Sequence, residues 1–280
     1  MEILSDPATL VYLVAALAVA GALIGFLAGL FGVGGGAISV PVFFEIFLVL
    51  GYAPDIAMPL AVGTSLAVII PISVSSAMGH NRRGTLDMAI LRIWTLPILV
   101  GVTLGAAIAR FAPPAVFQIV FVAVATMNAT KLLTGGKGWR LADTLPGQWS
   151  MRAAGTVIGL LSAIMGIGGG AISNLFLTLH GVAIHRAIST SAGVGVLIAV
   201  PGTVGYVLAG SGREGLPPDA IGFVSLAAFA LTIPTSLLTT RFGVALAHRM
   251  SRRALEIAFG SFLILVALRF LYSLFWPHGA

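Results

Sequence analysis

Hydrophobic residues fill most of the chain in long runs, and short polar or glycine-containing turns separate these runs. Runs such as TLVYLVAALAVAGALIGFLAGL and LEIAFGSFLILVAL approach the roughly 20 residues that a helix needs to cross a bilayer. The alternating segments of about 10 residues that are typical of a membrane β-barrel do not occur in the sequence. The pattern therefore predicts an all-α polytopic membrane protein.

The spacing of the runs and of the turn signals predicts five helices in each half of the chain. In the first half these helices are 8–31, 37–50, 56–79, 86–110 and 114–134. In the second half they are 152–166, 171–181, 186–210, 220–247 and 252–275. We interpret the ten segments as transmembrane helices. The longest polar stretch, TGGKGWRLADTLPGQW, divides the chain into a first repeat at 1–134, a cytoplasmic linker at 135–151 and a second repeat at 152–280.

The two halves share short motifs in the same order, which indicates a duplication. GVGGGAIS at 32–39 returns as GIGGGAIS at 166–173, and GTSLAV at 63–68 corresponds to STSAGV at 189–194. Further glycines recur at the spacing of the second motif: Gly79 and Gly84 in the first half, Gly205 and Gly210 in the second.

Basic residues concentrate in alternate loops, as the positive-inside rule describes. If the acidic N-terminus lies outside, nine basic residues fall inside and two outside: Arg82, Arg83, Lys137, Arg140, Arg152, Arg186, Arg249, Arg252 and Arg253 against Arg110 and Arg213. This bias predicts that both termini lie outside. Because each repeat holds an odd number of helices, the second repeat enters from the opposite face, which gives the inverted repeat of many secondary transporters.

The segments 37–50 and 171–181 are too short to cross the membrane. As helices they would rise only about 21 and 16 Å, whereas the hydrocarbon core is about 30 Å thick. Each follows directly on a glycine run, and short glycine-interrupted segments in corresponding positions of two halves point to a transport site. A helix that begins after Gly36 or Gly170 presents free N–H groups and a positive dipole end, which bind anions.

We therefore predict an anion site near the midplane, built from two helix N-termini and neighbouring hydroxyl groups. Its residues are Gly34, Gly35, Gly36, Ser39, Thr64, Ser65, Gly168, Gly169, Gly170, Ser173, Asn174, Thr190, Ser191 and Arg241. The alternative for any single small residue is helix packing, which glycine and serine commonly serve in membranes. For the Thr-Ser pairs, a bond back to the own helix is a further alternative.

Composition narrows the remaining chemistry. Only 9% of the residues are charged, against about 25% in soluble domains, and the net charge of +6 reflects topology rather than nucleic-acid binding. There is no cysteine, and no histidine has a metal-binding spacing to a carboxylate. The first glycine run fits G-x-G-x-x-A, but no strand precedes it, so we predict no cofactor. Neither G-x-S-x-G nor H-E-x-x-H occurs, so an intramembrane enzyme is a weaker alternative than a channel. A structural or scaffolding membrane protein is comparably disfavoured, because it would not need two helix breaks at membrane depth.

A few charged residues fall within or near the apolar segments. Arg92 lies close enough to an inner helix end to snorkel, and Arg241 is a candidate for guiding the substrate. Glu45 could carry a proton or lie at the interface. Lys131 and Arg269 fall near corresponding places in the last helix of each half, and no role is assigned to them.

The motifs GLFGVGGGAISVP, AVGTSLAV, MGIGGGAIS and AISTSAGVGV resemble the sulfite exporter TauE/SafE family over nearly the whole chain. One departure is Ser189 where the first half has Gly63. The resemblance implies a transporter of the bacterial cytoplasmic membrane for sulfite, sulfonates or related sulfur-containing anions. Together with the anion site it predicts a multi-pass secondary transporter that exports by alternating access, with a coupling proton or ion left open. An anion channel is the main alternative.

Overall fold

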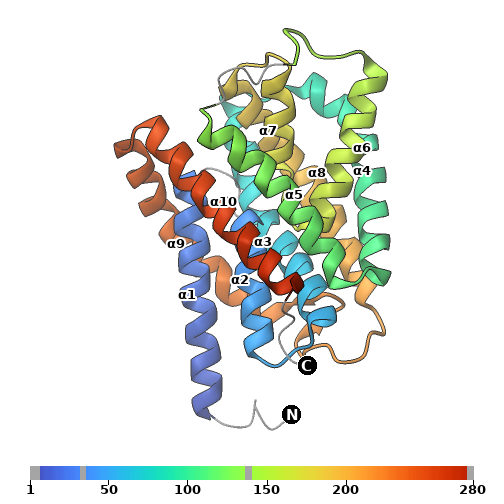
Figure 1. Ribbon diagram of the computed structural model, residues 1–280, viewed down its shortest axis with the longest axis vertical. Coiled ribbons are helices and arrows are strands. Elements are labelled where there is room, and N and C mark those ends of the chain that lie inside the picture. The colour runs from blue at the N-terminus through green and yellow to red at the C-terminus, as the bar shows by residue number, and fades with distance from the viewer. Residues whose placement is uncertain (1–6, 32–35, 136–140, 276–280) are drawn as a thin grey trace.

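The computed structural model describes residues 7–31, 36–135 and 141–275, and within these it is almost entirely helical (Figure 1). The helices are α1 Pro7–Phe31, α2 Gly36–Val49, α3 Pro54–Arg82, α4 Met88–Phe111, α5 Pro114–Leu133, α6 Gln148–Met165, α7 Gly170–Leu179, α8 Ile184–Gly210, α9 Leu226–Arg249 and α10 Arg252–Phe275. The prediction of an all-α protein is confirmed, and all ten predicted segments contain a helix.

Local signals at the helix starts explain several of these boundaries. Helices α3 and α5 begin at Pro54 and Pro114, because proline suits the first helical turn, where its missing N–H has no partner to lose. The Asp87 carboxylate accepts hydrogen bonds from the N–H groups of Ala89 and Ile90 and so caps α4. Helix α6 begins at Gln148, somewhat before the predicted 152.

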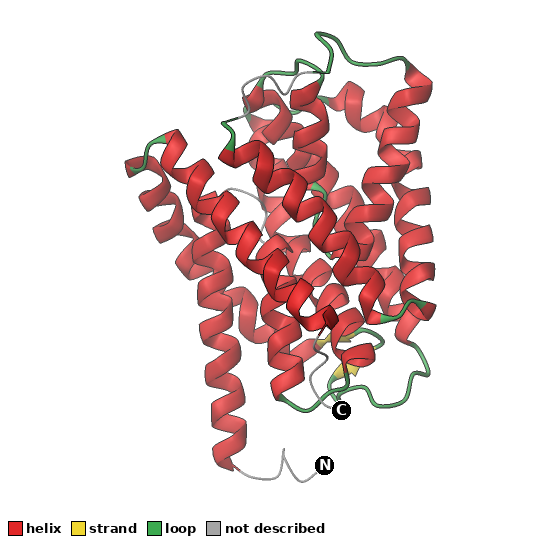
Figure 2. Cartoon of the chain, viewed as in Figure 1, coloured by secondary structure: helices red, strands yellow, loops and turns green. Residues whose placement is uncertain are grey.

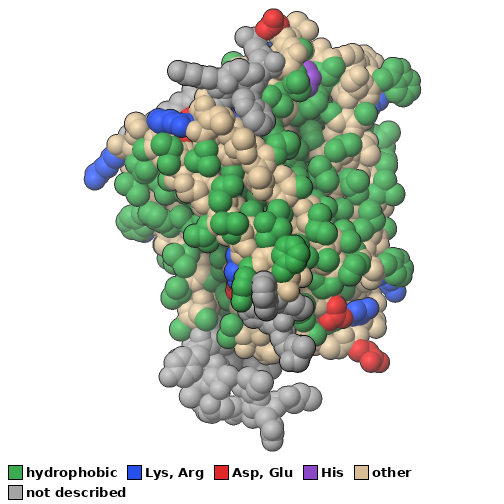
Figure 3. All heavy atoms as spheres, viewed as in Figure 1, with side chains coloured by type: hydrophobic (Ala, Val, Ile, Leu, Met, Phe, Trp, Pro, Cys, Tyr) green, Lys and Arg blue, Asp and Glu red, His purple; other side chains and the backbone are tan. Residues whose placement is uncertain are grey.

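Six helices of the described residues are long and apolar enough to cross a membrane, namely α1, α3, α4, α5, α8 and α10. Figure 3 shows the face over α10 and α5 covered largely by hydrophobic side chains, with most charged side chains toward its two ends. A surface of this kind is stable against lipid rather than water. The chain is therefore a multi-pass membrane protein.

Helices of the two halves pair with each other throughout the bundle. Helix α1 packs along α9, α4 along α6, α3 along α8, and α5 along α10. Glycines allow the closest approaches: a Cβ on Gly25 of α1 would lie 2.1 Å from the Ser236 carbonyl oxygen of α9. A Cβ on Gly159 of α6 would likewise lie 2.5 Å from the Ile98 carbonyl oxygen of α4. Such contacts between small residues are the usual basis of helix association in membranes.

The short helices α2 and α7 turn back into the bundle. Leu141 and Ala142 of the linker donate backbone hydrogen bonds to the Leu179 carbonyl at the end of α7. The linker also leads into α6, so the chain enters α6 and leaves α7 at the same end of the bundle, which we call the linker end (Figure 1). Helix α7 has only 10 residues and rises about 15 Å, too little to cross alone.

The predicted helix at 220–247 was wrong at its start. A two-stranded hairpin, β1 Ala220–Ile221 and β2 Val224–Ser225, precedes α9 (Figure 2). Gly222 has a positive φ of 56°, which turns the chain, and Ser225 caps α9 by accepting from the Ala228 N–H. Contacts with other helices hold the hairpin: Phe223 N–H donates to the Tyr206 carbonyl, and the Phe223 carbonyl oxygen lies 2.1 Å from where a Cβ of Gly63 would be.

Candidate functional site

The break between α6 and α7 packs directly against the start of α2. Gly166 and Gly169 have φ values of +65° and +70°, which other residues rarely adopt, and they let the chain reverse within four residues. A Cβ on Gly36 would lie 2.8 Å from Ile167 Cα and 2.9 Å from the Gly166 carbonyl oxygen. The break between α6 and α7 thus meets the start of α2 inside the bundle. Gly34 and Gly35, which were also predicted site residues, lie outside the described residues.

The N-terminus of α7 carries polar groups without partners. Ser173 N–H donates to the Gly169 carbonyl, but the N–H groups of Gly170, Ala171 and Ile172 have no backbone acceptor among the described residues. The Ser162 hydroxyl of α6 is fully buried, has no hydrogen-bond partner among the described residues, and lies 3.4 Å from where a Gly169 Cβ would be. Unsatisfied donors at a helix start, with the positive dipole end, favour an anion.

The four predicted serines form two corresponding hydroxyl pairs. Ser39 of α2 lies 2.6 Å from Ser65 of α3, and Ser173 of α7 lies 2.9 Å from Ser191 of α8, measured between Oγ atoms. Ser65 also donates to the Gly166 carbonyl across the two halves, at 2.8 Å. All four side chains are buried. The hydroxyls therefore brace the helix breaks while lying beside them.

The two predicted threonines, Thr64 and Thr190, hold the starts of other helices instead. The Thr64 hydroxyl accepts from the Ser225 N–H at the start of α9, at 3.0 Å, and the Thr190 hydroxyl accepts from the Asp87 N–H at the start of α4, at 3.3 Å. Both side chains are completely buried. Each threonine thus joins the third helix of one half to the fourth helix of the other.

A small cavity adjoins the α6–α7 break and the start of α2. The volume within which the centre of a water molecule can move is about 10 Å³, so the cavity holds roughly one water. Ala37 at the start of α2, Ala171 at the start of α7 and Ile167 line one side, and residues of α5 and α10 line the other. Asn128 is the polar side chain of this lining. A molecule larger than water fits this cavity only if these helices separate.

The remaining candidate residues are Asn174, Arg241 and Glu45. Asn174 of α7 has a buried carbonyl oxygen, Oδ1, without a hydrogen-bond partner. Arg241 is exposed; its Nε donates to the Leu238 carbonyl of the same helix, and its guanidinium stacks on Phe242. The structure thus places the Arg241 side chain on the exposed surface of α9, in the part of that helix that packs against the last turns of α1. Glu45 of α2 forms an ion pair with Arg269 of α10 at 2.9 Å.

One contact that the sequence did not suggest bears on the enzyme alternative. Ser189 Oγ lies 3.0 Å from Nδ1 of His80, which links α8 to α3 at the linker end. The same hydroxyl also lies 2.8 Å from the His185 carbonyl oxygen, to which it can donate. A serine nucleophile donates its hydroxyl hydrogen to the base, so at Ser189 the His185 carbonyl competes with the ring nitrogen for that hydrogen.

At the end opposite the linker, several polar groups surround the hairpin. Asp219 accepts from the Ser225 hydroxyl and from the Ala227 N–H, which fixes the hairpin to α9. Burial, and to a smaller extent the Asp219 carboxylate, raise the pKa of Tyr52 in the loop before α3. The phenol therefore stays neutral at this end of the bundle.

Replacement of Ser39 or Ser173 by alanine should weaken anion binding modestly. Each change removes one hydroxyl beside a helix start, which corresponds to about 0.5–1.5 kcal/mol, or roughly a 2- to 13-fold loss of apparent affinity. The measurement is a titration with sulfite and with methanesulfonate that follows thermal stabilisation of the purified protein. Wild-type affinity in both variants would mean that the serines only brace the breaks.

Comparison with known proteins places the chain among membrane transporters. A family model described as Sulfite exporter TauE/SafE matches residues 17–270. A probable membrane transporter protein of Haemophilus influenzae is 31% identical, over 89% of this chain and 94% of the relative. A probable membrane transporter protein of Methanocaldococcus jannaschii is 28% identical, over 88% of this chain and 91% of the relative. No solved structure gives a significant match.

Proposed function

The chain belongs to the sulfite exporter TauE/SafE family, and on that premise we propose that it is a secondary transporter of small sulfur-containing anions such as sulfite or sulfonates. The observation that carries the anion assignment is the start of α7. Three N–H groups without backbone acceptors and the unpartnered Ser162 hydroxyl lie there inside a membrane bundle. A helix start can bind an oxyanion without a basic side chain. The proposed site comprises this start, the start of α2 and the two serine pairs.

The pairing of helices supports an inverted repeat. The first helix of each half packs on the fourth helix of the other, and the third and fifth helices pack on their own counterparts. The serine pairs and the threonine contacts repeat in the same way. The pair α6–α7 starts and ends at the same face, so it adds an even number of membrane crossings to its half. The other three helices of that half each cross once, so the total number of crossings stays odd. The inverted topology therefore does not depend on ten full spans.

Topology can be tested with single cysteines, because the natural chain has none. Thr144 of the linker and Ser211 after α8 are both exposed. We expect a membrane-impermeant maleimide to label Thr144→Cys only from the cytoplasmic side and Ser211→Cys only from the outside of the bacterial inner membrane. A tag after Ala280 should report the outside as well. Labelling of the linker and the C-terminal tag from one side would exclude the inverted repeat.

A difference between the two halves favours alternating access. Helix α4 packs along α8, whereas the corresponding α9 makes much less contact with α3. A Cβ on Gly205 of α8 would lie 2.5 Å from the Ala106 Cβ of α4, but a Cβ on the corresponding Gly79 of α3 would have no described atom within 4 Å beyond its own helix. The linker end of α3 is exposed, while the hairpin at 220–225 fills the opposite end. We interpret this arrangement as the state that opens toward the linker end.

The function is tested by transport into liposomes. Purified protein should move sulfite or methanesulfonate in a saturable manner, with competition between the two and with a dependence on the pH or ion gradient. Sulfate and a panel of cations serve as comparisons. Saturable transport of a cation that sulfur oxyanions do not affect would contradict the proposal. A flux that follows the membrane potential without any coupling ion would favour the channel alternative.

A further inference from the structure

Lys131 in the last turn of α5 is a half-buried cation next to the short helix α7. Its Nζ donates to the Thr178 hydroxyl at 2.6 Å. Within the described part of the chain no carboxylate lies within ion-pair distance of this ammonium, whereas Arg186, Arg213, Arg253 and Arg269 all have one. A half-buried ammonium whose protein partner is a neutral hydroxyl keeps its charge and two of its donors for another ligand.

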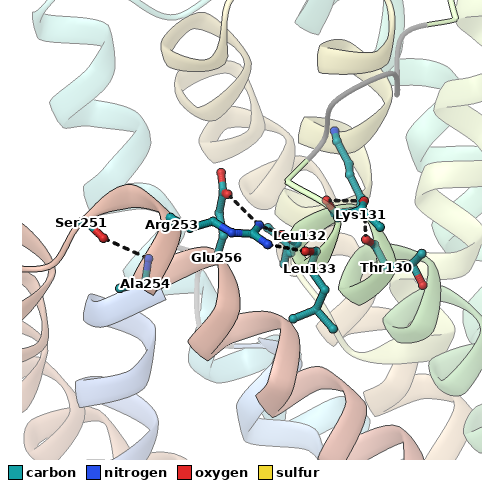
Figure 4. Close-up of polar contacts among 9 residues, drawn as sticks. Thr130, Lys131, Leu132, Leu133, Ser251, Arg253, Ala254 and Glu256 are labelled. Atoms are coloured by element: carbon teal, nitrogen blue, oxygen red, sulfur yellow. Dashed lines mark hydrogen bonds and ion pairs between the residues drawn. The ribbon is translucent and has the colours of Figure 1, made fainter.

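The Lys131 ammonium is not needed to cap the carbonyl groups at the C-terminal end of α7. The carbonyls of residues 176–179 at its end already accept backbone hydrogen bonds, from the N–H groups of Leu141, Ala142, His180, Gly181 and Val182. It does not cap α5 either, since Arg253 donates to the Leu132 and Leu133 carbonyls there and pairs with Glu256. Figure 4 shows the Lys131 side chain rising away from Arg253 and Glu256. A purely structural role therefore leaves the charge of Lys131 unexplained.

The corresponding cation of the other half, Arg269, has a carboxylate partner that Lys131 lacks among the described residues. Arg269 occupies the corresponding place in α10 and, like Lys131, contacts the short helix of the opposite half near its end. Its partner there is the Glu45 carboxylate, at 2.9 Å. The chain thus supplies a permanent counter-ion at one end of the bundle and a neutral hydroxyl at the linker end. The linker end is also the one we interpret as open.

A line of polar groups connects Lys131 with the start of α7. Asn128 lies one turn earlier on α5 and lines the cavity beside Ala171. Asn174, with its unpartnered buried oxygen, lies between Thr178 and Ala171 on α7. Thr178 lies seven positions after Ala171, which corresponds to about 10 Å along the helix axis. An anion at Lys131 would therefore be two helical turns from the free N–H groups.

We propose that Lys131 binds the sulfur oxyanion at the linker end of the transport path, before the anion reaches the start of α7. The inference rests on the proposed function, because it assigns a second binding position to the same substrate. The ligand class follows from the chemistry: a small anion with several acceptor oxygens can use the remaining N–H donors of the ammonium. A charged donor strengthens such bonds relative to neutral ones.

The test is a binding titration of Lys131→Gln and Lys131→Arg with sulfite and methanesulfonate, combined with uptake into liposomes. We expect Lys131→Gln to lose roughly 10- to 100-fold in apparent affinity, the range for a hydrogen bond to a charged group. Lys131→Arg should keep most of the affinity because the charge remains. The control is Arg92→Gln, which removes an exposed cation from α4 and should bind like the wild type.

A second variant keeps the lysine and supplies the missing counter-ion. Thr178→Glu should give Lys131 a partner like that of Arg269, so that affinity falls as in Lys131→Gln while the melting temperature does not. This variant decides the question if Lys131→Gln does not fold. Wild-type affinity in Thr178→Glu and Lys131→Gln would overturn the inference and leave the proposed function intact. Failure of the wild type to bind or move any sulfur anion would overturn the proposed function, and the inference with it.

Discussion

Replacement of Gly169 by leucine should abolish anion binding and transport. Gly169 immediately precedes α7 with a φ of +70°, and a Cβ there would lie 2.3 Å from the Ile198 Cδ1 atom and 3.1 Å from Val194 Cγ1. A leucine side chain must therefore push these neighbours aside and cover the free N–H groups at the helix start. Alanine should do less harm, since its strain is limited to the left-handed backbone, about 1–2 kcal/mol, and to a shift of one flexible methyl group.

Gly212 provides a matched control for the backbone. Its φ is +75° and nothing lies within 4 Å of where its Cβ would be, so leucine or alanine there meets the same backbone strain without crowding the site. Both Gly212 variants should transport normally. Binding is measured as thermal stabilisation by sulfite on the monodisperse fraction of each variant. If that fraction of Gly169→Leu bound sulfite with wild-type affinity, Gly169 would be a packing residue and the site would lie elsewhere.

The positions of the helices follow from the sequence because their signals are local. Long apolar runs, Pro54, Pro114 and the Asp87 cap fix most boundaries within a few residues. The hairpin at 220–225 could not be predicted in this way, since AIGFVS continues an apolar run. Its position depends on backbone contacts with Gly63 and Tyr206, which lie far away in the sequence.

The sequence likewise predicted some residues of the candidate site and missed others. The repeated motifs indicated Ser39, Ser65, Ser173 and Ser191, and the structure brings these together in two pairs. Ser162 was missed because the corresponding residue of the first half is Ala28, so the repeat gave no signal there. The direction of Arg241 and the contact between Lys131 and Thr178 depend on how helices rotate and pack, which a single apolar segment does not encode. A comparison of the two repeats therefore identifies site residues that occur in both halves and misses those that occur in only one.

The asymmetry between the halves makes Gly79 a sensitive position for the transport cycle. In the present state a Cβ at this position meets no described atom within 4 Å beyond its own helix, and leucine favours the helix by somewhat under 1 kcal/mol because glycine is a poor helix former. If the other state packs α9 along α3, as α4 now packs along α8, the same leucine must obstruct it. We expect Gly79→Leu to fold, to keep its melting temperature and to bind sulfite, but to lose transport.

Gly205→Leu is the corresponding change in the other half and should behave in the opposite way. The Ala106 Cβ already lies 2.5 Å from where the Gly205 Cβ would be, so leucine there must push α4 away and lower the melting temperature of the present state. Melting curves, sulfite binding and liposome uptake of the two variants together separate a packing defect from a blocked cycle. Full uptake by Gly79→Leu would show that α9 does not close on α3, and the alternating-access proposal would then have to rest on other helices.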